Sequence, residues 1–174
     1  MTILFILLHP FFLLQNFIMQ DTEVRWQQER KLTFGDFKGT APPATPWAAT
    51  TNSMIHFSYE SDGSRITRVN VSASFIPEKS WIKKRLPEVL SHEQLHFDIT
   101  EIFARKFYQE VIQVKSATRN ELSSLFKKAN SDCDRFQQQY DDETDHGTNE
   151  VMQAKWKEKV TALLQSSQPY PMEQ

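Results

Sequence analysis

The sequence predicts an α+β fold in which a small antiparallel sheet is followed by three helices. Apolar and polar residues alternate in two segments that both end before residue 76. From Pro87 onward, apolar residues instead recur at steps of three and four, which is the period of an amphipathic helix. We therefore expect a single domain over residues 21–165. A flexible tail over residues 166–174, with Pro169 and Pro171, is expected to follow it.

The two alternating segments predict an antiparallel hairpin. Ile55, Phe57 and Tyr59 fall on one side of the first segment. Four apolar residues share a side of the second segment, namely Val69, Val71, Ala73 and Phe75. An Asp-Gly turn within residues 61–64 separates the segments, as is typical of a hairpin. One face should therefore pack on the core, and the polar face should meet solvent.

Three helices are expected after the hairpin. The first runs from Pro87 to about Val114 without an interior glycine or proline. The second contains apolar residues from Leu122 to Tyr140 and stops by Gly147, and the third covers residue 149 to about residue 164. Upstream of the hairpin, the prolines predict an irregular segment over the core; they are Pro42, Pro43 and Pro46.

Composition excludes several classes of function. The chain of 174 residues has a net charge of -2, which offers no general attraction to nucleic acid. Its single cysteine, Cys133, excludes an intramolecular disulfide or a thiolate-rich metal cluster and is expected to be a buried thiol. With 4 glycines, the chain also lacks a glycine-rich phosphate loop. From these exclusions we expect a compact soluble domain.

The first twenty residues predict export. Residues 1–20 carry no charged side chain, and the apolar stretch Ile3–Leu14 has the length of a signal-peptide core. It is too short to span a bilayer. We therefore expect a secreted or periplasmic protein, although no basic residue precedes the stretch. The alternatives are an uncleaved anchor, through which alone the protein would touch a membrane, and a start codon placed too far upstream.

The first predicted helix contains the motif His-Glu-x-x-His at residues 92–96. His92 and His96 lie one helical turn apart on the same face, so both imidazoles can bind one Zn²⁺ ion. Glu93 is rotated by about 100° from the first histidine and can act as general base on a water that the metal acidifies. The alternative is a chance match to a short pattern in a helix that binds no metal.

The third metal ligand is less clearly indicated by the residues themselves. His146 follows an acidic run at the end of the second predicted helix, where Gly147 lets the backbone turn. Glu143 shares a helical face with Tyr140, and Asp141 could serve as a ligand or accept a hydrogen bond from a ligand imidazole. The ranking is His146, then Glu143, then Asp141. His56 is expected to be exposed on the strand face opposite Ile55.

Several stretches of the sequence, among them the His-Glu-x-x-His motif and the segment around His146, resemble a bacterial family of predicted secreted zinc-dependent proteases. The resemblance rests on five stretches: 32–39, 48–50, 80–82, 92–99 with the basic run that follows it, and 140–147. It covers nearly all of residues 30–160. The resemblance implies an exported zincin-like metallopeptidase and favours His146 as the third ligand. One departure is Phe34, which stands where tryptophan is usual.

The leading hypothesis is a zinc-dependent metallopeptidase. His92, His96 and His146 would bind Zn²⁺, Glu93 would be the catalytic base, and Tyr140 would donate to the oxyanion. A peptide or protein substrate could add to an edge of the hairpin. One alternative is a non-catalytic secreted binding module with a structural or vestigial zinc site. Another is a zinc hydrolase of non-peptide substrates, such as cell-wall amides.

Overall fold

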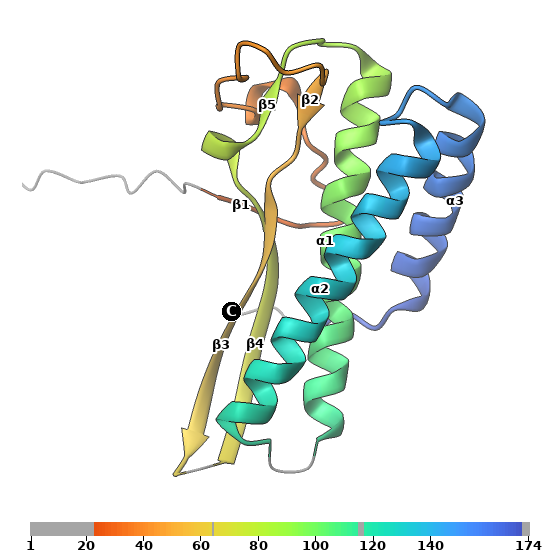
Figure 1. Ribbon diagram of the computed structural model, residues 1–174. Helices are drawn as coiled ribbons and strands as arrows, with labels where there is room; N and C mark the ends of the chain where they lie inside the picture. The colour runs from red at the N-terminus through yellow and green to blue at the C-terminus, as the bar shows by residue number, and fades with distance from the viewer. Residues whose placement is uncertain (1–22, 64, 115–116, 172–174) are drawn as a thin grey trace, which may run out of the picture.

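The computed structural model describes residues 23–63, 65–114 and 117–171 and has the expected α+β fold (Figure 1). The predicted leader over residues 1–20 lies outside the described residues. The elements in chain order are β1 (Val24–Arg25), β2 (Ala49–Thr50), β3 (Ser53–Asp62), β4 (Arg65–Phe75), β5 (Trp81–Ile82), α1 (Pro87–Gln113), α2 (Arg119–Thr144) and α3 (Glu150–Ser166). Short 3-10 turns at Phe34–Asp36 and Pro77–Lys79 interrupt the irregular segments.

The predicted hairpin is confirmed as β3 and β4, which form a three-stranded antiparallel sheet with β1 in the order β1-β4-β3. The apolar residues pair as the alternation predicts, with Ile55 opposite Ala73 and Phe57 opposite Val71. Gly63 takes a φ of 63° in the connecting turn, a conformation that glycine adopts without steric cost. The hairpin therefore presents one apolar face to the helices.

The polar face of the hairpin is less exposed than its sequence predicts. Ser72 and Ser74 are both buried, although they alternate with the core residues of β4. Strand β1 pairs with this end of β4 and places Arg25 opposite Ser74. The prediction of a fully solvated outer face is therefore wrong at this end of the strand, because an N-terminal segment without a strand pattern of its own lies beside it.

The three predicted helices are confirmed, and successive helices run in opposite directions (Figure 1). Helix α1 begins at Pro87, where the missing N–H costs nothing. At the start of α2, Thr118 and Glu121 bond each other's backbone N–H in a capping box. Helix α3 begins after Asn149, whose side-chain oxygen accepts from the Met152 N–H.

Helix α1 is the centre of the core, in contact with β3 and β4 and also with α2 and α3. Phe57 of β3 packs on Phe107 of α1 and on Phe126 of α2, with ring centroids 5.4 and 4.6 Å apart. On the far side, Trp156 of α3 lies on Tyr140 of α2. Although α1 is enclosed on several sides, its N-terminal half borders an opening in this shell, which His92 and Glu93 help to line.

A second sheet borders that opening. Strands β2 and β5 pair antiparallel, with Ala49 opposite Ile82 and Thr50 opposite Trp81. This small sheet lies by the N-terminal half of α1, near the end of α2 and the start of α3 (Figure 1). The proline-containing segment before β2 is irregular, as predicted.

The C-terminal segment makes defined contacts with the body of the protein. The Tyr170 hydroxyl donates to Glu101 of α1 over 2.6 Å, and Arg105 donates to the carbonyls of Leu164 and Ser167. These contacts hold residues as far as Tyr170 against α1, beyond the domain end expected at residue 165. Among the described residues, no helix is both long and apolar enough to cross a membrane.

Candidate metal centre

Helix α1 places His92, Glu93 and His96 at the opening between the small sheet and the end of α2. His92 and Glu93 are almost fully buried, with 5% and 4% of their surfaces exposed. The two histidines lie one turn apart, and their Nε2 atoms are separated by 3.1 Å. The helical spacing of the motif thus brings both imidazole nitrogens to one point.

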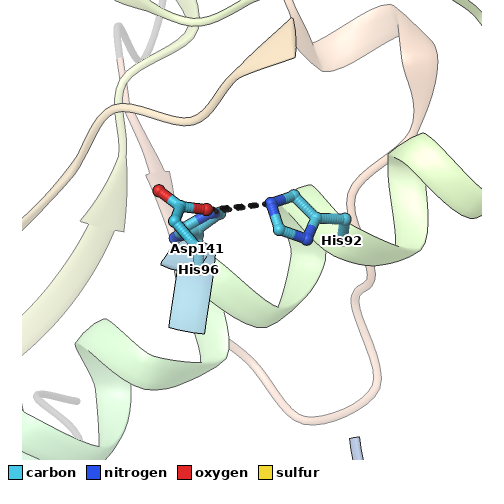
Figure 2. Close-up of side chains that lie close together, drawn as sticks. All are labelled: His92, His96 and Asp141. Carbon is cyan, nitrogen blue, oxygen red and sulfur yellow. Dashed lines mark hydrogen bonds and ion pairs between the residues drawn. The ribbon is translucent and has the colours of Figure 1, made fainter. Parts of the chain in front are cut away.

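Asp141 of α2 supplies a third donor atom at the same point. Its Oδ1 lies 3.1 Å from the Nε2 of His92 and 3.0 Å from the Nε2 of His96. Figure 2 shows these side chains pointing toward one another from the two helices. Among the described residues, these three make up the group whose ligand atoms are close enough to share a metal ion.

The donor set fits a tetrahedral ion such as Zn²⁺. Donors at about 2.0–2.1 Å from a tetrahedral ion are about 3.3–3.4 Å apart, close to the separations of 3.0–3.1 Å between the present atoms. Two imidazoles and one carboxylate form a common ligand set for catalytic zinc, which keeps a position open for water or substrate. Calcium or magnesium would instead favour a shell of oxygen donors.

The charges at this point favour a cation. Burial opposes ionisation of Asp141, but its close contacts with the two histidine rings hold its pKa well below the usual range. For His96, burial lowers the pKa, but the contact with Asp141 and the charge of Glu93 outweigh this effect and raise it. The pocket therefore stabilises positive charge between these residues, whether a proton or a metal ion carries it.

Each histidine also has a glutamine on its other ring nitrogen. Gln153 of α3 places its Oε1 3.1 Å from the Nδ1 of His92, and Gln137 of α2 contacts the Nδ1 of His96 in the same way. These contacts orient both rings from behind, away from Asp141. A metal-binding histidine usually has such a partner on its second nitrogen.

Glu93 is unusual because one of its buried oxygens lacks a partner. Its Oε2 makes no hydrogen bond to any of the described residues. Buried carboxylate oxygens are rarely left in this state unless they serve a ligand or water. Glu93 lines a cavity of about 670 Å³ together with His92, His96 and Asp141. Glu93 therefore combines an unpartnered buried oxygen with a place in the wall of a cavity large enough for a substrate.

His146, the predicted third ligand, lies beside the three-donor group and outside it. Its Nδ1 is 3.7 Å from the Oδ1 of Asp141, and its ring packs against Trp47, with centroids 3.9 Å apart. Asp145 and His146 both adopt left-handed backbone conformations, with φ values of 49° and 50°. This turn directs His146 to the rim of the cavity, whereas Asp141, five residues earlier and still within α2, faces α1.

Glu143 and His56 lie away from the donor group. Glu143 is exposed and accepts a hydrogen bond from the Trp156 indole, so the expectation that it shares the buried face of Tyr140 is wrong. The Nε2 of His56 lies 2.7 Å from a Glu23 carboxylate oxygen on the partly exposed strand face, as the alternation predicts.

Tyr140 supports the site from behind. It is fully buried, and its hydroxyl bonds to Gln153 and to the carbonyl of His92. Its ring stacks on the His92 ring, with centroids 4.6 Å apart. The predicted role of Tyr140 as an oxyanion donor is therefore wrong, because a hydroxyl held in this position does not reach the cavity.

Gly147 packs directly on the first histidine. Its φ is 83°, and a Cβ atom added at this position would lie 2.9 Å from the Cγ and Nδ1 of His92. Real Cβ contacts of that length essentially do not occur. Gly147 is thus needed both for the left-handed turn and for the close approach of backbone to the imidazole.

Sequence reasoning ranked Asp141 last and missed both glutamines. A usable pattern was present, since Gln137 and Asp141 are four residues apart and so share a face of α2. That face meets the face of α1 that carries His92 and His96. The periodicity of α2 alone does not reveal which of its faces meets the motif.

Comparison with known proteins identifies a family but no characterised relative. A family model described as "Bacterial protein of unknown function (DUF922)" matches residues 22–147. This range includes all three residues of the donor group and ends at Gly147. No curated protein and no solved structure shows a significant match to the chain.

Proposed function

The chain belongs to this bacterial family of unknown function, DUF922, and we propose that it is a zinc-dependent hydrolase that cleaves peptide bonds. The observation that carries this proposal is the unpartnered buried oxygen of Glu93 beside three convergent donors. A purely structural metal site needs donors but has no use for an unpartnered carboxylate oxygen on a residue that lines a cavity. A hydrolytic site needs both.

In this proposal His92, His96 and Asp141 would hold the ion, and Glu93 would not bind it. A bound zinc ion would supply Lewis acidity toward a carbonyl oxygen and would lower the pKa of a coordinated water. Glu93 would accept a proton from the attacking water and deliver it to the leaving amine. Burial of Glu93 limits its contacts with bulk water, so its free oxygen is reserved for that proton.

The walls of the cavity suit an extended polypeptide. Residues 47–51, which include β2, form one wall. Backbone groups alternate in direction along a strand, and the Ala48 carbonyl points to the β5 side, where it accepts from Lys83 and Lys84. The N–H and C=O groups of Ala49 and Thr51 therefore point away from β5. An extended substrate could pair with this edge by main-chain hydrogen bonds.

This substrate edge differs from the one that the sequence suggested. The strand residues that line the cavity come from β2, and none comes from the described part of the β3–β4 hairpin. Trp47, with 45% of its surface exposed, and Leu86 add apolar surface to the same cavity. A peptide with an apolar side chain next to the cleaved bond would use this surface.

The test compares wild type with Glu93→Gln on a mixture of unstructured peptides, with products read by mass spectrometry. Glu88→Gln is the matched control, because Glu88 lines the same cavity on the same helix. We expect Glu93→Gln to retain zinc and to lose activity by about 10²-fold or more, the scale of general-base catalysis. Glu88→Gln should retain most of its activity.

Three results would argue against the proposal in different ways. A Glu93→Gln variant as active as wild type would remove the assigned base. A zinc-loaded wild type that cleaves no peptide would favour the non-catalytic binding module. Cleavage of other amides alone, such as those of cell-wall fragments, would keep the metal chemistry and reject the peptide substrate.

A further inference from the structure

We propose that Gln137 and Gln153 are positioning residues that fix the proton of each histidine on Nδ1 and so direct both Nε2 lone pairs at one cation. This inference rests on the metal site of the proposed function. Each glutamine contacts one ring, on the nitrogen that faces away from Asp141. Neither glutamine lies in the His-Glu-x-x-His motif.

The hydrogen bond between the Gln153 side-chain amide and the Tyr140 hydroxyl determines whether the amide oxygen or the amide nitrogen faces His92. The Tyr140 hydroxyl oxygen lies 2.7 Å from the Nε2 of Gln153, 3.0 Å from its Oε1 and 3.3 Å from the His92 carbonyl oxygen. The shortest of these contacts is the one in which the amide nitrogen donates, so the hydroxyl proton is directed at one of the two carbonyl oxygens. Tyr140 thus accepts from the amide nitrogen, which leaves the amide oxygen, 3.1 Å away, for His92. An amide oxygen only accepts, so the proton of the His92 ring must lie on Nδ1.

The second glutamine is oriented in the same way by different partners. The Nε2 of Gln137 donates to the Thr100 hydroxyl over 3.2 Å and contacts the Sγ of Cys133. The Thr100 hydroxyl in turn donates to the carbonyl of His96. These bonds assign the amide oxygen of Gln137 to the Nδ1 of His96.

The consequence is a cluster of acceptors that has room for a cation. With both Nδ1 atoms protonated, the neutral rings present two Nε2 lone pairs 3.1 Å apart, and Asp141 adds a carboxylate oxygen 3.0–3.1 Å from each. Three acceptors at such distances repel one another until a positive charge lies between them. Helix α3 supplies none of the three atoms that would bind the metal. Through Gln153, however, it orients the His92 ring and so sets the direction of the His92 Nε2 lone pair.

The test replaces each glutamine with leucine, which has similar volume but no acceptor, and with glutamate, which restores an acceptor. Gln138→Leu is the matched control, because Gln138 lines the cavity and bonds Asp142 instead of a histidine. Two-dimensional ¹H–¹⁵N spectra of the metal-free protein at alkaline pH report the imidazole tautomers. Competition with a chromophoric chelator gives the dissociation constant for zinc, and circular dichroism checks that each variant folds.

We expect the Nδ1–H tautomer at both histidines in wild type and its loss at the affected ring in each leucine variant. Zinc affinity should fall about 10–100-fold in the leucine variants, as for other residues that support metal ligands, and recover in the glutamate variants. Gln138→Leu should match wild type. An Nε2–H tautomer at either ring of wild type, or leucine variants with unchanged tautomers and affinity, would overturn the inference.

These outcomes separate this inference from the proposed function. If wild type binds zinc with the expected tautomers but cleaves nothing, the positioning role stands and the hydrolase proposal fails. If Glu93→Gln loses activity while both leucine variants bind zinc as wild type does, the hydrolase stands and the positioning role fails.

Discussion

At the scale of single residues, the site depends on atoms that are missing as much as on atoms that are present. Gly147 has no Cβ, and only for that reason can the turn after α2 lie against the His92 ring. Glu93 has no partner for one oxygen, which leaves that oxygen for a water or substrate proton. A Cβ atom at position 147 would remove the first feature, and a hydrogen-bond partner for the free oxygen of Glu93 would remove the second.

Gly147→Ala tests this close approach, and Gly63→Ala is its control. Both glycines have positive φ, but a Cβ at Gly63 would meet nothing within 4 Å. Gly63→Ala should cost about 1 kcal/mol of unfolding free energy, from backbone conformation alone, and leave zinc affinity unchanged. Gly147→Ala should cost more and weaken zinc binding by about tenfold or more, since it displaces His92. Equal effects of the two changes on stability and affinity would contradict this account.

Cys133 is a buried thiol that contacts Gln137 but lies outside the metal-donor group. Burial raises the pKa of its thiol to about 11, and the thiolate is the reactive form. Because the folded protein holds this proton more tightly than a free thiol does, stability should decline as pH rises above the ordinary thiol pKa. We expect iodoacetamide to label Cys133 at pH 8 only after denaturant is added, as measured by intact mass. Rapid labelling of the folded protein would show that the thiol is accessible.

At the scale of secondary-structure elements, α1 carries two distinct sets of motif residues. His92, Glu93 and His96 face the cavity, whereas Gln94 and Asp98 bind the N-terminal segment. Asp98 accepts from the Trp26 indole over 2.7 Å, and Gln94 accepts from the Leu32 N–H over 2.6 Å. The extended motif thus combines a candidate metal site with the attachment of residues that come before the hairpin.

Removal of the N-cap side chains of α2 and α3 allows the contributions of these helices to stability and to zinc binding to be compared. Thr118→Ala and Asn149→Ala should each cost about 1 kcal/mol, the usual value for loss of an N-cap. Only Asn149→Ala should also weaken zinc binding, because Gln153 lies in the first turn that this cap stabilises. Chemical denaturation and zinc competition measure the two effects. If Thr118→Ala weakened zinc binding as much as Asn149→Ala, the proposed role of the α3 start would be wrong.

At the scale of the whole molecule, the sequence predicts those parts of the fold that have a local pattern. The hairpin and the three helices have clear periods, and Asp62-Gly63 and Gly147 mark the ends of such segments in the sequence. The strands β1, β2 and β5 have two residues each and are too short to show a period. They form only because distant segments pair, which is also why burial of Ser72 and Ser74 was not predicted.

In the candidate site too, some features follow from a local sequence pattern and others depend on how the helices pack. The placement of His92 and His96 follows from the helical repeat alone. The choice between Asp141 and His146 depends on how α2 crosses α1 and on two left-handed residues after Thr144, which are tertiary features. His146 as a ligand therefore remains a prediction, and the geometry favours Asp141. The roles of Gln137 and Gln153 needed all three helices in place.

The most direct test of the central claim is a zinc titration of the metal-free protein, made in parallel on wild type, Asp141→Asn and His146→Gln. We expect one tightly bound zinc per chain in wild type and binding weakened by about tenfold or more in Asp141→Asn. His146→Gln should stay close to wild type. A wild type that takes up no zinc, or an Asp141→Asn variant with wild-type affinity, would contradict the account.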